Sequence, residues 1–176
     1  MSVILPGRHT ADIKGDFVVF IIGMRINKPW AVHKWMPVAS AMPKMQAALA
    51  AKPETGFLAG ENYFNLLTRT SCSIQYWRTF EDLEKFAKNP SETHLKAWKS
   101  FNKAIGNNGT VGIWHETYRV KANQYECVYG NMPRFGLANA GDHVPATGVF
   151  KNAKSRITRP IEKEDDLGRD DLKKTA

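Results

Sequence analysis

The sequence has little cysteine and no long hydrophobic run. Only Cys72 and Cys127 occur in 176 residues, far apart and outside any CxxC pair, which excludes a cysteine-rich zinc module and a disulfide scaffold. The longest apolar run, residues 17–22, is far too short to cross a bilayer, and residues 1–15 carry no signal-peptide pattern. We therefore expect a cytoplasmic protein with reduced thiols and no membrane partner.

Motifs of several large enzyme classes are also missing. The chain contains no HExxH or HxxxH pair, no P-loop, no GxGxxG and no GxSxG, which argues against zinc proteases, nucleotide-binding enzymes and serine hydrolases. Its formal net charge of +8 comes from lysines and arginines that are scattered rather than clustered. No RRM, KH or zinc-finger pattern accompanies them, so we expect a solvated basic surface and no nucleic-acid partner.

The composition is that of a globular protein. Hydrophobic residues make up 43% and charged residues 24% of the chain, and its length suits one domain with a substantial core. We predict an N-terminal arm over residues 1–15, one domain over residues 16–150, and a charged, flexible tail over residues 151–176, where apolar residues are almost absent.

Hydrophobic periodicity predicts alternating strands and helices along the domain. Residues 16–27 are apolar and β-branched, which is typical of a buried strand, and residues 71–78 alternate as a half-buried strand does. A helix follows Pro29, with apolar residues every three or four positions. Pro37 and Pro43 fall inside it, so it is expected to be kinked or split in two. The other predicted elements are strands at 55–68, 110–121 and 125–129, a helix at 80–88 capped by Thr79, a helix at 91–105, and a loop at 130–150.

The order of these elements is β–α–β–β–α–β, the split βαβ pattern of a ferredoxin-like fold. The predicted fold class is therefore α+β, with one antiparallel sheet covered by helices on one face. Apolar residues on both faces of the strand at 16–24 indicate that the second face is covered as well. Pairing of two such sheets is the simplest cover, so we expect a homodimer.

A set of short motifs in fixed order resembles a known family. The motifs lie at residues 18–20, 23–27, 76–78 and 112–118, at His94 with Trp98, and between residues 125 and 138. Together they resemble the monooxygenase-like family of the dimeric α/β-barrel superfamily, whose fungal members include a polyketide monooxygenase of the fumagillin pathway. The resemblance covers about residues 8–147 and leaves the tail outside.

This resemblance implies a dimeric α/β-barrel and an enzyme that oxidises a small organic substrate, aromatic or polyketide-like. The superfamily includes cofactor-free oxygenases, haem degraders and haem-dependent aldoxime dehydratases, so the implied cofactor is either none or haem. Three alternatives stay open: a non-catalytic dimer that binds haem or another small molecule, a haem-dependent dehydratase of the aldoxime dehydratase kind, and a structural dimer whose motif residues only hold the fold. A shared fold does not decide between them.

The densest cluster of chemically capable side chains lies on the predicted strand at 110–121. Neighbours on a strand point to opposite faces, so His115 and Glu116 cannot form an adjacent acid–base pair. His115 is predicted to be a general base or an axial haem ligand, or else a structural histidine. Glu116 is predicted to be catalytic, or else to pair with Arg25 or Arg78, because an unpaired buried carboxylate is costly.

Further candidates come from the other elements. His94 is the second possible haem ligand, by its place relative to haem-degrading relatives, and is otherwise a helix-surface histidine. Asn65 is the third predicted catalytic residue, since Asn, Trp and Arg near one another resemble cofactor-free oxygenases in which the substrate carbanion activates oxygen. Asn65, Gln75 and Tyr76 on the middle strands could bind a substrate oxygen. The predicted substrate-binding residues, with ordinary core packing as the alternative for the tryptophans, are Trp77, Trp114, Tyr118, Tyr76, Arg25 and His33.

Overall fold

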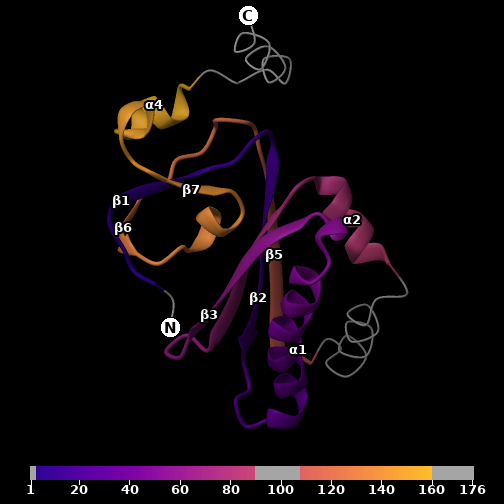
Figure 1. Ribbon diagram of the computed structural model, residues 1–176. Coiled ribbons are helices and arrows are strands. Elements are labelled where there is room, and N and C mark those ends of the chain that lie inside the picture. The colour runs from indigo at the N-terminus through magenta and orange to yellow at the C-terminus, as the bar shows by residue number, and fades with distance from the viewer. Residues whose placement is uncertain (1–2, 90–107, 160–176) are drawn as a thin grey trace, which may run out of the picture.

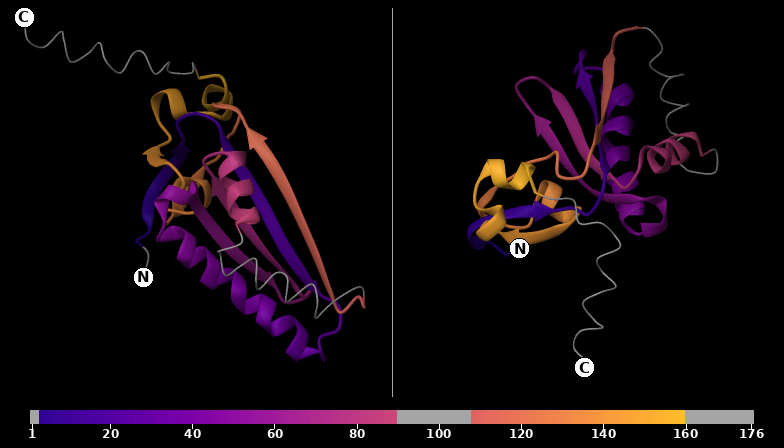
Figure 2. Two further views of the ribbon diagram at one scale, coloured as in Figure 1. Left: turned by 90° about the vertical axis from the view of Figure 1, so that its right-hand side faces the viewer. Right: turned by 90° about the horizontal axis from the view of Figure 1, so that it is seen from above.

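The computed structural model describes residues 3–89 and 108–159, and its main sheet has four antiparallel strands. They are β2 (Phe17–Ile26), β3 (Phe57–Asn65), β4 (Thr70–Trp77) and β5 (Val111–Val120), in the order β3-β4-β2-β5. Helices α1 (Val32–Ala50) and α2 (Phe80–Lys88) lie on one face of this sheet (Figures 1 and 2). This is the ferredoxin-like strand order, so the predicted α+β class with an antiparallel sheet is confirmed.

Both described long helices follow their local sequence signals. The Thr79 hydroxyl accepts a hydrogen bond from the Asp82 backbone N–H at 3.0 Å, which is the predicted cap of α2. Helix α1 is a single helix that contains Pro37 and Pro43, so a split into two helices does not occur. The helix predicted at 91–105, which includes His94, lies outside the described residues. No helix in the described part of the chain is both long enough and apolar enough to span a membrane.

The core between helices and sheet follows the two-residue period of the strands. In β2, Val18, Met24 and Ile26 are buried on the side of the helices, because alternate side chains of a strand share one face. Val18 packs in one cluster with Leu49, Phe57, Trp77 and Leu83. Met24 and Ile26 pack in a second cluster with Val111, and Trp35 and Val38 of α1 cover it. The helix layer therefore rests on two separate groups of apolar side chains.

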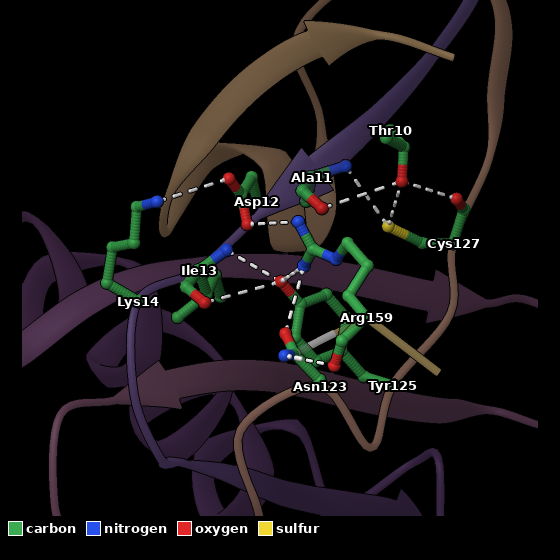
Figure 3. Close-up of polar contacts among 9 residues, drawn as sticks. All are labelled: Thr10, Ala11, Asp12, Ile13, Lys14, Asn123, Tyr125, Cys127 and Arg159. Atoms are coloured by element: carbon green, nitrogen blue, oxygen red, sulfur yellow. Dashed lines mark hydrogen bonds and ion pairs between the residues drawn. The ribbon is translucent and has the colours of Figure 1, made fainter. Parts of the chain in front are cut away.

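A second, smaller sheet forms from residues that the sequence placed in the arm and in the late loop. Its strands are β1 (Leu5–Asp12), β6 (Tyr129–Met132) and β7 (Asp142–Pro145), in the antiparallel order β6-β1-β7. The strand predicted at 125–129 is wrong, since β6 begins only at Tyr129. The side chains of Tyr125 and Cys127, rather than their backbone, form hydrogen bonds with the backbone at the end of β1. The Ile13 N–H donates to the Tyr125 hydroxyl at 2.6 Å, and the Ala11 N–H donates to Cys127 Sγ at 3.3 Å (Figure 3).

The small sheet covers one end of the main sheet on the face opposite the helices. Leu137 and Ala138, in the 3₁₀ helix Gly136–Asn139, are buried with Phe17 of β2, and Tyr76 of β4 packs against the same cluster. The rest of that face, toward the other end of the strands, carries no described element. The main sheet thus has a helix face and a second face that is covered only in part (Figure 2).

Residues 151–159 fold back onto β1. They include the short helix α4 (Ala153–Ile157) and end in Arg159, whose guanidinium donates to Asp12 Oδ1 at 2.9 Å and to Asn123 Oδ1 at 3.1 Å (Figure 3). Both members of the Arg159–Asp12 ion pair are only 14% exposed. The predicted division of the chain at residues 15 and 150 stays a prediction, because residues 160–176 lie outside the described part.

Candidate functional site

A cavity of about 330 Å³ lies between α1 and the main sheet. Its walls come from all four strands of the main sheet and from one side of α1, and most of the lining is apolar. The volume falls in the lower part of the range found for small-molecule sites. The lining residues are Ile22, Gly23, Met24, Val38, Ala39, Met42, Pro43, Asn62, Tyr63, Phe64, Ser71, Cys72, Ser73 and Ile113.

The cavity exists because small side chains face one another across the two layers. On β4 the residues that face α1 are Ser71 and Ser73, where a strand under a helix usually carries larger apolar groups. On α1 the facing positions include Ala39 and Pro43. Well-packed cores leave few voids larger than a water molecule, so a space of this size under a helix is a candidate binding site.

One wall of the cavity carries a chain of hydrogen-bonded polar side chains. The Trp77 indole N–H donates to Gln75 Oε1 at 3.1 Å, and Gln75 Nε2 donates to Ser73 Oγ at 3.3 Å. Gln46 of α1 also donates to Ser73 Oγ through Nε2, and its own Oε1 accepts from Asn62 Nδ2. Gln75, Ser73 and Gln46 are only 1%, 2% and 7% exposed. Buried amides need such partners, so this chain fixes the side chains that border the cavity.

The cavity wall is uncharged at neutral pH. Among the described residues that line it, none is Asp, Glu, Lys, Arg or His. Burial is the main cause that raises the pKa of the Cys72 thiol, and burial likewise raises the pKa of the Tyr63 phenol. Both groups therefore keep their protons at neutral pH, and by strand alternation both side chains belong to the face of the sheet opposite α1. A neutral wall of this kind suits an uncharged ligand, because a buried ion would lack a partner.

Trp77 and Asn65 do not take the positions that the sequence suggested. Trp77 is fully buried, with its ring 5.4 Å from the rings of Phe57 and Phe86, so it is a core residue that reaches the site only through its N–H. Asn65 is exposed and its Oδ1 accepts from the Thr68 N–H at 3.0 Å, which stabilises the turn between β3 and β4. Neither side chain lines the cavity.

The side chains of residues 114–118 in β5 alternate between the two faces of the sheet, as predicted. His115 is exposed on the helix side, two residues beyond the lining residue Ile113, with its ring 5.7 Å from that of Phe20. Glu116 accepts a hydrogen bond from the Tyr118 hydroxyl at 2.5 Å on the opposite face. Its partner is therefore Tyr118, whereas Arg25 bonds Asn27 and Arg78 pairs with Asp82.

The remaining predicted residues are also away from the cavity. Trp114 lies over Gly23 on the face opposite the helices and is 37% exposed. Tyr76 is on the same face under the small sheet, where burial is the main cause that raises its pKa to about 12. Arg25 and His33 are exposed, and neither lines the cavity. His94 lies outside the described residues.

None of the residues that line the cavity was among the predicted site residues, and Gln46, which bonds to two of them, was not predicted either. A signal was present for Ser73, because the alternation of β4 puts Ser71, Ser73 and Gln75 on the face that also carries Trp77. A polar face on a strand in the middle of a sheet indicates partners on the covering helix. Gln46 was the corresponding signal on α1, between the apolar positions Met45 and Leu49.

Comparison with known proteins places the chain in a family. Residues 17–137 match the model of the family described as Monooxygenase af470-like. The chain is 30% identical over 149 residues to the curated protein Monooxygenase af470 from Aspergillus fumigatus, with 74% of this chain and 53% of that protein covered. The chain thus spans about half the length of this curated relative.

Solved structures are similar in fold. The aldoxime dehydratase OxdRE, solved with butyraldoxime, superposes with a TM-score of 0.57 at 15% identity, over 80% of this chain and 40% of that one. SnoaB from Streptomyces nogalater, described as a cofactor-independent oxygenase, gives a TM-score of 0.42 at 14% identity, over 58% of this chain and 91% of that one. The match over residues 17–137, which contains the whole main sheet and its cavity, shows that this chain belongs to the Monooxygenase af470-like family.

Proposed function

We propose that the chain binds a small, uncharged, mostly apolar organic molecule in the cavity under α1 and oxidises it with molecular oxygen. The observation that carries the proposal is the cavity itself, with a volume of about 330 Å³ and no charged side chain among the described residues of its wall. The name of the relative Monooxygenase af470 supports the reaction class. An aromatic or polyketide-like substrate of two or three fused rings would match such a space.

Haem fits this cavity poorly. Haem iron takes an axial His, Cys, Met or Tyr, and the two carboxylates of the porphyrin call for cations. The described lining offers no histidine, lysine or arginine, so the porphyrin carboxylates would lack cations. The side chains of Cys72 and Tyr63 belong to the opposite face of the sheet, which leaves Met24 and Met42 as the described lining side chains of an iron-binding type. Across the described residues, no three His, Cys, Asp or Glu side chains group as a metal site. We therefore favour cofactor-free oxidation over the haem-dependent alternatives.

Cofactor-free oxidation sets a condition on the substrate. Conversion of an activated CH₂ group to C=O by one O₂ releases one water, and all four electrons come from the carbon, so no further reductant is needed. The CH₂ group must first lose a proton to a base. His115 remains our proposed base, because it is on the helix side of β5 next to Ile113 at the cavity wall. The protein would exclude water from the resulting carbanion.

Oxygen uptake with anthrone tests the proposal. Anthrone is a planar, uncharged compound with one activated methylene, and catalysed uptake above its spontaneous oxidation is expected. Met42→Trp fills the cavity from α1 and should lower the catalysed rate by about tenfold or more, because the reacting groups are displaced. Met36→Trp is the matched control, since Met36 is on the same helix, is 48% exposed and lies outside the cavity.

The outcomes separate the candidate functions. Equal uptake in the two variants would contradict the cavity as the active site. Anthrone binding without catalysed uptake in the natural protein would contradict the oxygenase and support the non-catalytic binding alternative. The cytoplasmic location stays a prediction.

We also propose that the chain works as a homodimer, paired through the second face of the main sheet. Trp114, Tyr118 and Tyr63 are 37%, 51% and 41% exposed, and the strand register places them on that face. Half-buried Ile21 and Ile74 belong to the same face. An aromatic and aliphatic surface of this kind is typical of a site where a second protein surface packs. The small sheet covers only one end of it.

A further inference from the structure

Ser73 is a buried hydroxyl at the cavity wall. It is 2% exposed, it lies on β4 in the middle of the main sheet, and it lines the cavity under α1. A serine hydroxyl has one hydrogen to donate and two lone pairs that accept. The partners of all three determine what the wall presents to a ligand.

Both lone pairs of Ser73 Oγ are taken by amide groups. The Trp77 indole can only donate, so its bond to Gln75 Oε1 fixes the orientation of the Gln75 amide, and Gln75 Nε2 must then donate to Ser73 Oγ. Gln46 Nε2 donates to the same oxygen from α1, because its Oε1 already accepts from Asn62. The chain of bonds therefore runs from Trp77 toward Ser73 on one side and from Asn62 toward Ser73 on the other.

The hydroxyl hydrogen of Ser73 is left without an acceptor among the described residues. Within residues 3–89 and 108–159, Ser73 Oγ takes part in two hydrogen bonds and is the acceptor in both. A buried donor without an acceptor costs free energy, and the open side of Ser73 is the cavity. An oxygen acceptor on a bound molecule would remove that cost.

We propose that the Ser73 hydroxyl is the donor that recognises a carbonyl or enolate oxygen of the cavity ligand. The inference rests on the proposed function and narrows its substrate class to apolar compounds that carry a ketone or quinone oxygen. The same donor would also stabilise the enolate formed during the reaction, because deprotonation next to a ketone moves negative charge onto that oxygen. A donor already held in place by two amides stabilises this charge without reorganisation.

A second assignment of the hydrogen bonds arises if the side-chain amides of Gln46 and Asn62 exchange the places of their oxygen and nitrogen atoms. If the Gln46 and Asn62 amides were both turned over, Ser73 would donate to Gln46, and the Asn62 N–H would be the free donor at the cavity. The fixed bond from Trp77 keeps a donor in surplus on this wall in both cases. The experiment must therefore separate Ser73 from Asn62.

Calorimetry with a matched pair of ligands makes that separation. The probes are 1-tetralone and tetralin, which differ by one ketone oxygen and are both small enough for the cavity. The measured quantity is the ratio of their affinities. Ser73→Ala should lower the preference for the ketone by about five- to tenfold, the effect of one lost hydrogen bond. Ser71→Ala is the control, because Ser71 lines the same cavity two residues earlier and should leave the ratio unchanged.

The ratio is insensitive to general damage, since a loosened cavity weakens both ligands alike. If Ser73→Ala does not fold, Ser73→Cys keeps the shape with a weaker donor and should show a smaller decrease in the same direction. An unchanged ratio in Ser73→Ala would overturn the proposal and assign the donor to Asn62. Failure of both compounds to bind would contradict the cavity as a site and this inference with it.

The binding measurement and the oxygen-uptake measurement test the two proposals independently. A ketone preference that depends on Ser73, without oxygen uptake from anthrone, would leave this inference standing and remove the oxygenase. Catalysed oxygen uptake, together with a ketone preference that is unchanged in Ser73→Ala, would support the oxygenase and contradict the role of Ser73.

Discussion

At the scale of single residues, polar groups that lost water without gaining a partner define the sensitive points of this protein. The hydroxyl hydrogen of Ser73 is one, although the Ser73 oxygen accepts two hydrogen bonds, and His143 is another. The His143 ring lies 4.8 Å from that of His9, and its Nε2 is buried without a hydrogen-bond partner in the part of the chain that the structure describes. Burial is the main cause that lowers the pKa of His143, followed by the nearby His9 and Arg134. The small sheet therefore holds a histidine that resists protonation.

This histidine predicts a loss of stability in mild acid. Its pKa is below 6.5 in the folded protein, so the unfolded chain binds the proton more readily when the pH falls below 6.5. The free energy of unfolding should decrease as the pH falls from 6.5 toward 5. His143→Gln should show a smaller decrease than the natural protein in urea unfolding at pH 7.5 and pH 5. His33→Gln is the control, because His33 is exposed on α1. Equal decreases in all three proteins would show that His143 does not set this dependence.

At the scale of elements, the sequence predicted what local periodicity can report. Strands β2, β4 and β5 and helix α2 were placed within a residue or two, because their alternation, apolar runs and cap are local signals. The small sheet was missed because its strands are held by pairing across more than 115 residues, as in His9 with Tyr129. Residues 5–12 include Pro6 and Gly7 and have no regular alternation of apolar and polar residues, so nothing local marks them as a strand.

The candidate site was predicted less well, for a physical reason. The sequence analysis favoured large and titratable residues, His115, Trp77 and Trp114, whose chemistry is visible one residue at a time. The cavity arises instead because the facing side chains of Ala39 and Ser73 are small, and because α1 covers this part of the sheet. Such absence of volume depends on the packing of two elements and not on either sequence alone.

At the scale of the whole molecule, the two faces of the main sheet carry different surfaces. The helix face holds the cavity, and the second face carries the exposed aromatic surface of β5. Gly23 belongs to this arrangement, because a Cβ there would lie 2.6 Å from the Ser71 carbonyl oxygen and 2.7 Å from the Trp114 ring, so a larger residue would displace them.

The second face predicts the oligomeric state. Sedimentation at micromolar concentration should give the mass of a dimer, and Trp114→Glu should yield monomers by burying a charge in the interface. Trp30→Glu is the control, because Trp30 is 76% exposed just before α1 and away from this face. A strictly monomeric natural protein would contradict the paired-sheet arrangement.

The most direct test of the central claim is a crystal structure of the protein grown with 1-tetralone. The account predicts the ligand between α1 and the main sheet, against Met42 and Ile113, with its ketone oxygen about 3 Å from Ser73 Oγ. A ligand on the second face of the sheet, or an undisturbed cavity beside a ligand bound elsewhere, would contradict it.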